Sequence, residues 1–177
     1  MTTLVDLDAF LAAALARREK TRAPAARSRR SVKAAIDLAA RCKARLEFRD
    51  FFGPVYLMDQ DIIVIPPCLY RLIQRQKFLS TVIMHELIHW SGAGTRMNRP
   101  RHIRLFDAVY NREELTAEIG AVLLSFDLGI TRRPILPNHR YLASYLASID
   151  RPDVALNVAL GQAEQAAAFL HMLGDPS

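Results

Sequence analysis

Residues 80–94 read STVIMHELIHWSGAG and place two histidines, His85 and His89, four positions apart, with Glu86 beside the first. The apolar residues around them predict a helix, and the glycines that end the stretch predict where it stops. Positions i and i+4 lie on one face of a helix, so both imidazoles can point at the same location. This HExxH pattern is typical of zinc sites in which two neutral histidines hold the metal and the glutamate polarises a water molecule.

A chance occurrence of this pattern is improbable. In a chain of 177 residues with 5 histidines, coincidence would produce one HExxH in roughly 0.5% of sequences of this composition. A catalytic zinc also needs a third protein ligand and a fourth position that is open to water. The motif therefore predicts a metal centre and directs attention to acidic residues elsewhere in the chain.

Candidates for the third ligand lie 25 residues past His89, in NREELTAEIGA at residues 111–121. Glu114 and Glu118 are four apart and share one face of the predicted helix, whereas Glu113 is turned about 100° away from Glu114. Small residues on this helix would let it approach the first one closely: Ala117, Gly120 and Ala121. The competing interpretation is a solvated acidic face at a helix start, which the helix dipole favours.

The rest of the chain alternates helical and β-rich patterns. Two β-rich runs in PVYLMDQDIIVIPP, residues 54–67, flank a polar turn and predict a β-hairpin. The spacing of apolar residues predicts helices over residues 4–18, 31–46, 78–90, 111–127, 138–149 and 152–173. These elements indicate an α+β fold with few strands.

The net charge of +6 lies entirely in residues 1–50, where twelve basic residues outnumber six acidic ones. We expect a basic helical N-terminal extension and linker over residues 1–50, and one main domain over residues 51–177. Affinity for phosphate backbones or acidic partners is expected in the first part. Candidate nucleic-acid contacts are Arg17, Arg18, Arg22, Arg27, Arg29, Arg30 and Lys33. The competing interpretation is a solvated helix end and linker, because the run lacks interleaved aromatic residues.

Cysteine usage and hydropathy bear on the compartment. Cys42 and Cys68 have no CxxC spacing and are too few for a disulfide framework, which favours a reducing environment. AFLAAALA at residues 9–16 imitates the apolar part of a signal peptide, but Asp6 and Asp8 precede it where basic residues belong. No other run approaches the roughly 18 apolar residues that span a bilayer. We therefore expect a cytoplasmic protein without a membrane partner.

Three stretches together resemble a known family. FLSTVIMHELIHWSGAGTRMNR at residues 78–99, REELTAEIGAVLLSFDLGI at 112–130 and NHRYLASYL at 138–146 are similar to one metallopeptidase domain. This is the zincin-type domain of ArdC-type antirestriction proteins and of phage and plasmid polyvalent proteins. The resemblance covers about residues 54–172. ArdC-type proteins carry a single-stranded-DNA-binding domain before the peptidase, and residues 1–50 are too short and too helical to be one.

The resemblance implies zinc held by His85, His89 and Glu114, with Glu86 as the general base and Glu118 hydrogen-bonded to a ligand histidine. We expect a zincin-like metallopeptidase fold of the α+β class, mostly helical, with a small antiparallel sheet beside the HExxH helix. The expected reaction is hydrolysis of peptide bonds in a protein or peptide substrate, linked to mobile elements or antirestriction. The strand DIIVI is expected to offer a sheet edge on which an extended substrate pairs.

Two other functions fit the same residues. A DNA-associated antirestriction or binding module with a non-catalytic zinc site would bind nucleic acid through residues 17–33 and cleave nothing. A regulatory protease would cut one specific repressor or host factor and leave other proteins intact. The presence of Glu86 disfavours the first alternative, because a purely structural zinc site needs no base.

Several further side chains have less specific roles. Trp90 and His171 are expected to be structural, because each lies on a predicted helix without a pattern that indicates chemistry. Candidates for stabilising an oxyanion are Tyr110, Tyr141 and Tyr145, and their spacing selects none of them.

Overall fold

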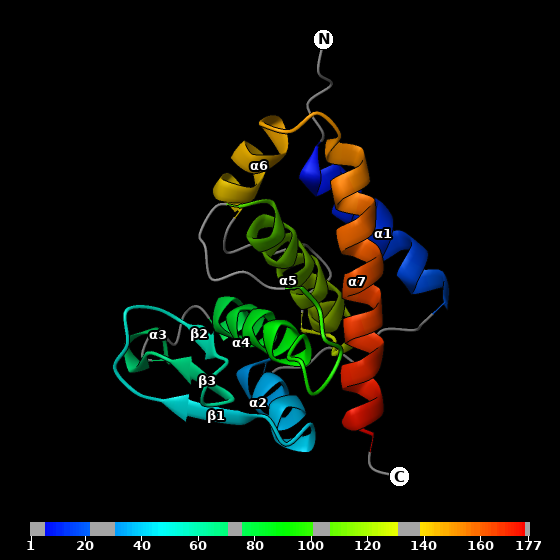
Figure 1. Cartoon of the computed structure of the whole chain (residues 1–177). Helices are drawn as coiled ribbons and strands as arrows, with labels where there is room; N and C mark the ends of the chain where they lie inside the picture. The colour runs from blue at the N-terminus through cyan, green and yellow to red at the C-terminus, as the bar shows by residue number, and fades with distance from the viewer. Residues whose placement is uncertain (1–5, 22–30, 71–75, 101–106, 131–138, 176–177) are drawn as a thin grey trace.

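The computed structural model describes residues 6–21, 31–70, 76–100, 107–130 and 139–175. Its elements follow in the order α1 (Leu7–Thr21), α2 (Ser31–Arg41), β1 (Arg45–Phe48), β2 (Val55–Leu57), β3 (Ile62–Ile65), α3 (Pro67–Tyr70), α4 (Gln76–Ser91), α5 (Ala108–Asp127), α6 (His139–Ala147) and α7 (Pro152–Leu173). In Figure 1, α7 runs alongside α5, while the small sheet lies on the other side of the molecule, near α4 and α2. Within the described ranges, none of the helices combines the length and apolarity that a membrane crossing requires.

The sheet has three strands in the order β1-β3-β2. β2 and β3 form the predicted hairpin and run antiparallel, with Val55 opposite Val64. β1 pairs in parallel with β3 and places Arg45 opposite Ile62, so the sheet is mixed and not purely antiparallel. Because β3 has a neighbour on both sides, the expectation that this strand offers a free edge is wrong.

The second predicted helix is shorter than its apolar pattern suggests. α2 ends at Arg41, and Lys43 then adopts a left-handed conformation with φ 60. This conformation is unfavourable for a non-glycine residue and cannot continue a right-handed helix. The backbone N–H of Ala44 donates to Ala39 at 2.9 Å and closes the turn. Leu46, expected at the end of the helix, therefore lies in β1.

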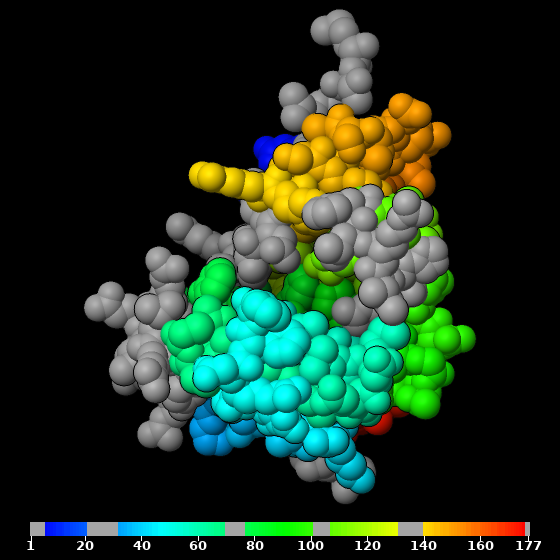
Figure 2. Space-filling model, turned by 60° about the vertical axis from the view of Figure 1, so that its left-hand side comes forward, coloured from blue at the N-terminus to red at the C-terminus, as the bar shows by residue number. Residues whose placement is uncertain are grey.

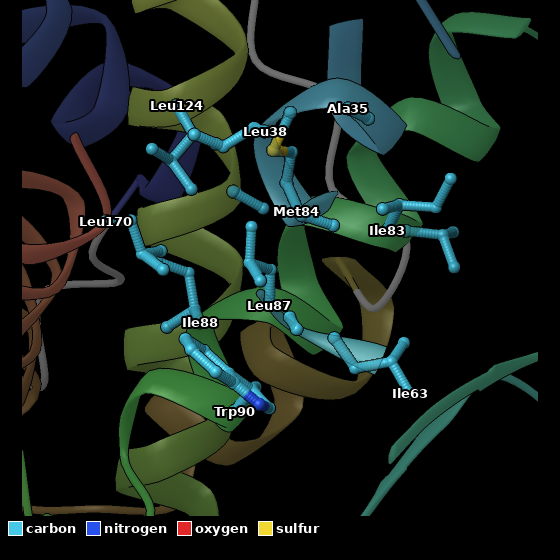
Figure 3. Packing of buried hydrophobic residues seen from close by; sticks show 14 of the residues in the cluster. Ala35, Leu38, Ile63, Ile83, Met84, Leu87, Ile88, Trp90, Leu124 and Leu170 are labelled. Carbon is cyan, nitrogen blue, oxygen red and sulfur yellow. The ribbon is translucent and has the colours of Figure 1, made fainter. Parts of the chain in front are cut away.

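Helix α4 lies at the centre of the main core. Figure 3 shows side chains from five elements meeting there, with Leu38 of α2, Ile63 of β3, Leu124 of α5 and Leu170 of α7 gathered near Leu87 of α4. Every residue of α4 from position 79 to 91 is buried, the polar His85, Glu86 and His89 as well as the apolar ones. Each large apolar side chain buried there contributes about 1.5–3 kcal/mol of transfer free energy, so α4 is a firmly held platform.

This core begins ahead of the boundary expected at residue 50. Ala35, Leu38 and Ala39 of α2 are buried in it, and α2 packs on α4. β1 adds the parallel strand of the sheet from the same part of the chain. Residues 31–48 are therefore packed into the body that carries the HExxH helix.

A second apolar cluster joins α1, α5, α6 and α7. At the end of α5, Asp127 accepts hydrogen bonds from Arg18 of α1 at 2.5 and 2.7 Å, and its Oδ2 lies 2.8 Å from Nε2 of His171 on α7. The Asp127 side chain is fully buried. His171 therefore has the structural role that its position predicts, and one carboxylate connects three helices.

Helix α5 begins and ends with local signals. Asp107 caps it by accepting the backbone N–H of Tyr110 at 2.7 Å, which starts the helix at Ala108, three residues before the predicted start. Gly129 has φ 66 and ends the helix where the sequence predicts. The stretch between them is almost wholly buried.

Candidate metal centre

The two histidines of α4 face each other and one carboxylate of α5. The Nε2 atoms of His85 and His89 lie 3.1 Å apart. The two carboxylate oxygens of Glu114 each lie 3.4 Å from one of these Nε2 atoms. Each of the three residues offers one ligand atom, and these atoms all lie within 4.8 Å of one another. The three side chains therefore form a group that can hold a metal ion. The spacing within each helix predicted these residues, and the crossing of the helices brings them together.

The acidic residues of α5 are not a solvated face. Glu113, Glu114 and Glu118 are 4%, 9% and 0% exposed, which overturns the competing interpretation of this helix start. Ionised carboxylates are buried only when charge partners or a metal compensate for lost hydration. The histidines of α4 face all three carboxylates here, and Arg99 also pairs with Glu113.

Electrostatics in this group favour positive charge. Burial by itself lowers the pKa of His85, but the carboxylates of Glu114, Glu118 and Glu86 outweigh it and raise that pKa to about 9. The pKa of His89 is likewise raised by Glu114 and Glu113 against the effect of burial. Burial would raise the pKa of Glu114, yet the two histidines hold it well below its usual range. The carboxylates favour positive charge at the histidines, and a divalent cation would supply that charge in place of the protons. The donor set therefore fits a metal ion.

Glu113 has a role that helical spacing did not predict. It is turned away from the two Nε2 atoms, as expected, but its Oε1 lies 3.1 Å from Nδ1 of His89. It also accepts two hydrogen bonds from Arg99, at 2.8 and 3.0 Å. Burial acts to raise the pKa of Glu113, but these two partners lower it to about 2. No sequence signal pointed to Arg99, because it reaches the site only through the loop after α4.

Glu118 lies near the outer nitrogen of the other histidine. Its Oε1 is 3.6 Å from Nδ1 of His85, slightly beyond hydrogen-bonding distance. Glu86 is buried beside His85 on α4 and adds negative charge there. The assigned roles of Glu118 and Glu86 remain predictions.

Of the three candidate tyrosines, Tyr141 is coupled to the metal-binding group. Its hydroxyl donates to Oδ1 of Asn111, which lies one helical turn before Glu114. Burial raises the pKa of Tyr141, and the charge of Glu114 raises it further, so the phenol keeps its proton. Burial also raises the pKa of Tyr145, and the charge of Arg112 acts against that rise.

The basic segment is only partly within the described residues. Arg18 is paired with Asp127, and Lys33 lies 2.6 Å from Asp37 on the exposed face of α2. Arg17 is exposed on α1. The remaining candidates lie outside the described residues: Arg22, Arg27, Arg29 and Arg30.

A helix-borne HExxH motif, a buried glutamate from a second helix and a small sheet beside the first helix define the zincin class. The chain belongs to the zincin-like metallopeptidase family (MPTase-PolyVal), whose model matches residues 34–160. The family and fold that the resemblance implied are thus confirmed.

Two curated proteins are similar over about half of the chain. An uncharacterized protein, y4eC, of Sinorhizobium fredii is 32% identical over 90 residues, which are 51% of this chain and 29% of that protein. The DNA primase TraC of Escherichia coli is 30% identical over 87 residues, which are 49% of this chain and 8% of that protein. The chain therefore spans less than a third of the length of these relatives.

Two solved structures share the fold. The Mn(II)-bound crystal structure of the antirestriction protein ArdC from plasmid R388 superposes with a TM-score of 0.67 at 23% identity, covering 81% of this chain and 53% of that one. The metal-free structure of the same protein gives a TM-score of 0.62 at 22% identity, covering 86% of this chain and 53% of that one. The chain thus corresponds to about half of ArdC.

Proposed function

We propose that this protein is a zinc-dependent metallopeptidase that hydrolyses peptide bonds. The observation that supports it is a buried group of two imidazoles and one carboxylate, with a further buried glutamate, Glu86, directly beside His85. A site that only held a metal in place would need the three ligands and no adjacent base. His85, His89 and Glu114 would hold the zinc ion.

A zinc ion held by these residues would supply Lewis acidity and make a water in the site a better nucleophile at neutral pH. The Glu86 carboxylate then accepts a proton from the attacking water and later delivers it to the amine of the leaving peptide. Nδ1–H of His89 would donate a hydrogen bond to Glu113, which would leave the lone pair of Nε2 free to bind the metal. Glu118 has the same proposed role at Nδ1 of His85.

An extended peptide is the substrate form that the surface favours. Figure 2 shows a hollow between the sheet residues, in cyan, and α6, in yellow, with atoms of α4 and α5 at its bottom. Among the described strands, β2 has one neighbour and packs on α4, so its outer edge offers backbone groups beside the HExxH helix. Backbone pairing along such an edge gives affinity with little dependence on substrate sequence.

A link to mobile elements and antirestriction is part of the proposal. It is supported by the family and by the structural likeness to plasmid ArdC. The charge in residues 1–50 supports nucleic acid as a further partner. A protease that cuts a single regulatory target is compatible with the same site.

Glu86→Gln tests the reaction. This change keeps size and helix propensity but removes the base, so zinc content and thermal stability should stay near the wild-type values while cleavage falls by roughly 10² to 10⁴-fold. Zinc is measured by metal analysis of the purified chain, and cleavage with a denatured protein substrate. His89→Ala serves as the metal-binding control and should lose stoichiometric zinc.

The outcomes separate the three functions. Equal cleavage by wild type and Glu86→Gln would remove Glu86 as the base. If neither protein cleaves but both protect DNA from restriction in cells, the non-catalytic module is favoured over the peptidase. If denatured proteins stay intact and one host or plasmid protein is cut, the regulatory protease is favoured.

A further inference from the structure

Arg99 is a buried cation that the proposed reaction does not use. It is only 8% exposed, and its guanidinium is surrounded by acceptors. Nε and Nη2 donate to the two carboxylate oxygens of Glu113 at 3.0 and 2.8 Å. Nη2 also donates to the backbone carbonyl of Ile88 at 2.6 Å, and Nη1 to Oγ of Ser91 at 3.0 Å. Such complete pairing is what a buried guanidinium requires.

We propose that Arg99 is a positioning residue of the metal centre, acting on His89 through Glu113. A two-point guanidinium–carboxylate contact fixes both the place and the plane of the carboxylate. The oxygen that Nη2 contacts, Oε1 of Glu113, is also the one that lies 3.1 Å from Nδ1 of His89. Arg99 therefore sets the direction from which His89 is held, and with it the direction of Nε2.

The backbone around Arg99 is shaped to deliver this contact. A Cβ atom on Gly92 would stand 2.7 Å from Nη2 and 2.9 Å from Cζ of Arg99, so the guanidinium occupies the space left by the missing side chain. The N–H of Arg99 donates to the carbonyl of Gly92 at 3.0 Å, and that of Met97 to Ser91 at 3.1 Å. Asn98 adopts φ 48 within the same turn. The loop thus folds back on the end of α4 and returns its arginine to the site.

The geometry also identifies a matched control in the same loop. Arg96 donates to Asp61 at 2.6 and 3.1 Å and to the backbone carbonyl of Trp90 at 2.6 Å. Its guanidinium carbon lies 3.9 Å from the centroid of the Trp90 ring. Arg96 therefore anchors the loop to the hairpin without touching the carboxylates of α5. Replacing it tests loop anchoring alone.

The test compares zinc affinity among Arg99→Gln, Gly92→Ala and Arg96→Gln. Loss of the support behind a ligand histidine typically weakens metal binding by about 10 to 100-fold. Arg99→Gln should show this loss, and Gly92→Ala, which displaces the guanidinium without removing it, should show a smaller loss in the same direction. Arg96→Gln should bind zinc as wild type does, even if its melting temperature falls further. Affinities come from competition with a chromophoric chelator, and circular dichroism confirms folding.

Two further readouts separate positioning from general stability. The visible absorption spectrum of the Co²⁺-loaded chain should change in Arg99→Gln and not in Arg96→Gln, because only the first alters the ligand geometry. In a Glu113→Gln background, Arg99→Gln should cause little further loss of zinc affinity, since its route to His89 is already broken. Full additivity of the two changes would contradict the proposed route.

The inference rests on the proposed zinc site, and the outcomes keep the two apart. If the wild-type chain binds no zinc, both are overturned. If wild type binds zinc and both Arg99→Gln and Gly92→Ala bind it equally well with an unchanged Co²⁺ spectrum, only the role of Arg99 is overturned. Should Arg99→Gln fail to fold, Gly92→Ala decides the question.

Discussion

Gly120 of α5 lies directly against Ile88 of α4, where a Cβ atom on the glycine would stand 2.6 Å from Cδ1 and 2.7 Å from Cγ1 of the isoleucine. Ile88 immediately precedes His89, and Gly120 lies two residues past Glu118. The missing side chain therefore permits the close approach of the two helices that carry the metal-binding group. The sequence predicted such an approach from the small residues of α5, and this contact is where it occurs.

Gly120→Ala should push α4 and α5 apart and weaken zinc binding by about tenfold or more, because the ligands come from both helices. Overpacking of this kind also destabilises a core by about 1–3 kcal/mol. Gly161→Ala on α7 is the control, since a Cβ there meets nothing within 4 Å. Restoring affinity by adding Ile88→Ala, which removes Cδ1, Cγ1 and Cγ2 together, to Gly120→Ala would confirm the steric cause. Unchanged zinc affinity in Gly120→Ala would show that the helix spacing is not critical.

Glu114→Gln should lose zinc affinity more than any other single change among the carboxylates of α5. Its two oxygens are the ones that face both Nε2 atoms, whereas Glu118 faces only an outer nitrogen. Glu164→Gln, on an exposed position of α7, is the charge-matched control and should bind zinc normally. Metal titration of wild type, Glu114→Gln, Glu118→Gln and Glu164→Gln ranks their zinc affinities. A larger loss for Glu118→Gln than for Glu114→Gln would mean that the third ligand is misassigned.

Tyr141→Phe should lower kcat by about 10²-fold while leaving zinc affinity unchanged. The burial and charge that raise its pKa keep the phenol protonated, so it can donate a hydrogen bond to a developing oxyanion when it exchanges its hydrogen bond with Oδ1 of Asn111. Burial raises the pKa of Tyr145 without a contribution from Glu114, so Tyr145→Phe should retain most activity. Steady-state kinetics of both variants give the comparison. Wild-type rates in both variants would contradict the assignment and leave Tyr110 as the remaining tyrosine candidate.

Arg18 and Arg17 are neighbours with different expected effects. Arg18→Gln leaves the buried Asp127 without its two-point partner and should destabilise the fold by about 3 kcal/mol. Arg17→Gln on the exposed side of α1 should change stability by less than about 0.5 kcal/mol. If the basic segment binds nucleic acid, Arg17→Gln should weaken that binding and reduce its salt dependence. Chemical denaturation and DNA titrations at several salt concentrations measure the two effects.

The two cysteines should differ in reactivity and in its pH dependence. Cys42 is buried, donates its thiol to the carbonyl of Leu170 at 3.3 Å, and burial raises its pKa to about 11, whereas Cys68 is exposed. The folded state therefore holds the Cys42 proton between pH 9 and 11 while the unfolded state releases it, so this contribution to stability is full below pH 9 and lost as pH rises to 11. At pH 8, a thiol reagent should modify one cysteine quickly and Cys42 only on unfolding. In Cys68→Ser, only the slow modification of Cys42 should remain. A fast phase of modification in that variant would contradict the assignment.

Local periodicity was sufficient to predict the candidate ligands. His85 and His89 lie on one face of α4 because they are four residues apart, and that relation holds in any α-helix. Glu114 and Glu118 share a face of α5 for the same reason. The hairpin of β2 and β3 was also predictable, because its strands flank a short polar turn within one stretch of chain.

The parallel pairing of β1 with β3 was not predictable in this way. It joins residues 45–48 to residues 62–65, which are neighbours in the sheet although β2 lies between them in the sequence. Parallel partners also have no tight turn between them that a sequence pattern could reveal. The apolar pattern of α2 continued as far as Leu46 and so predicted helix there. The left-handed turn at Lys43 decides that the chain extends instead.

The sequence by itself therefore determined which side chains each helix presents on one face. In a helix of fixed period, the face on which a residue lies depends only on its spacing from the others. The tertiary structure decided which faces meet. Glu113, assigned by spacing to the wrong side for a ligand, reaches His89 from behind because α5 crosses α4 at that turn. Arg99 reaches Glu113 because the loop after α4 folds back through the space at Gly92. Contacts of this kind depend on the distance between elements and the path of a loop, and neither has a period that a sequence pattern can express.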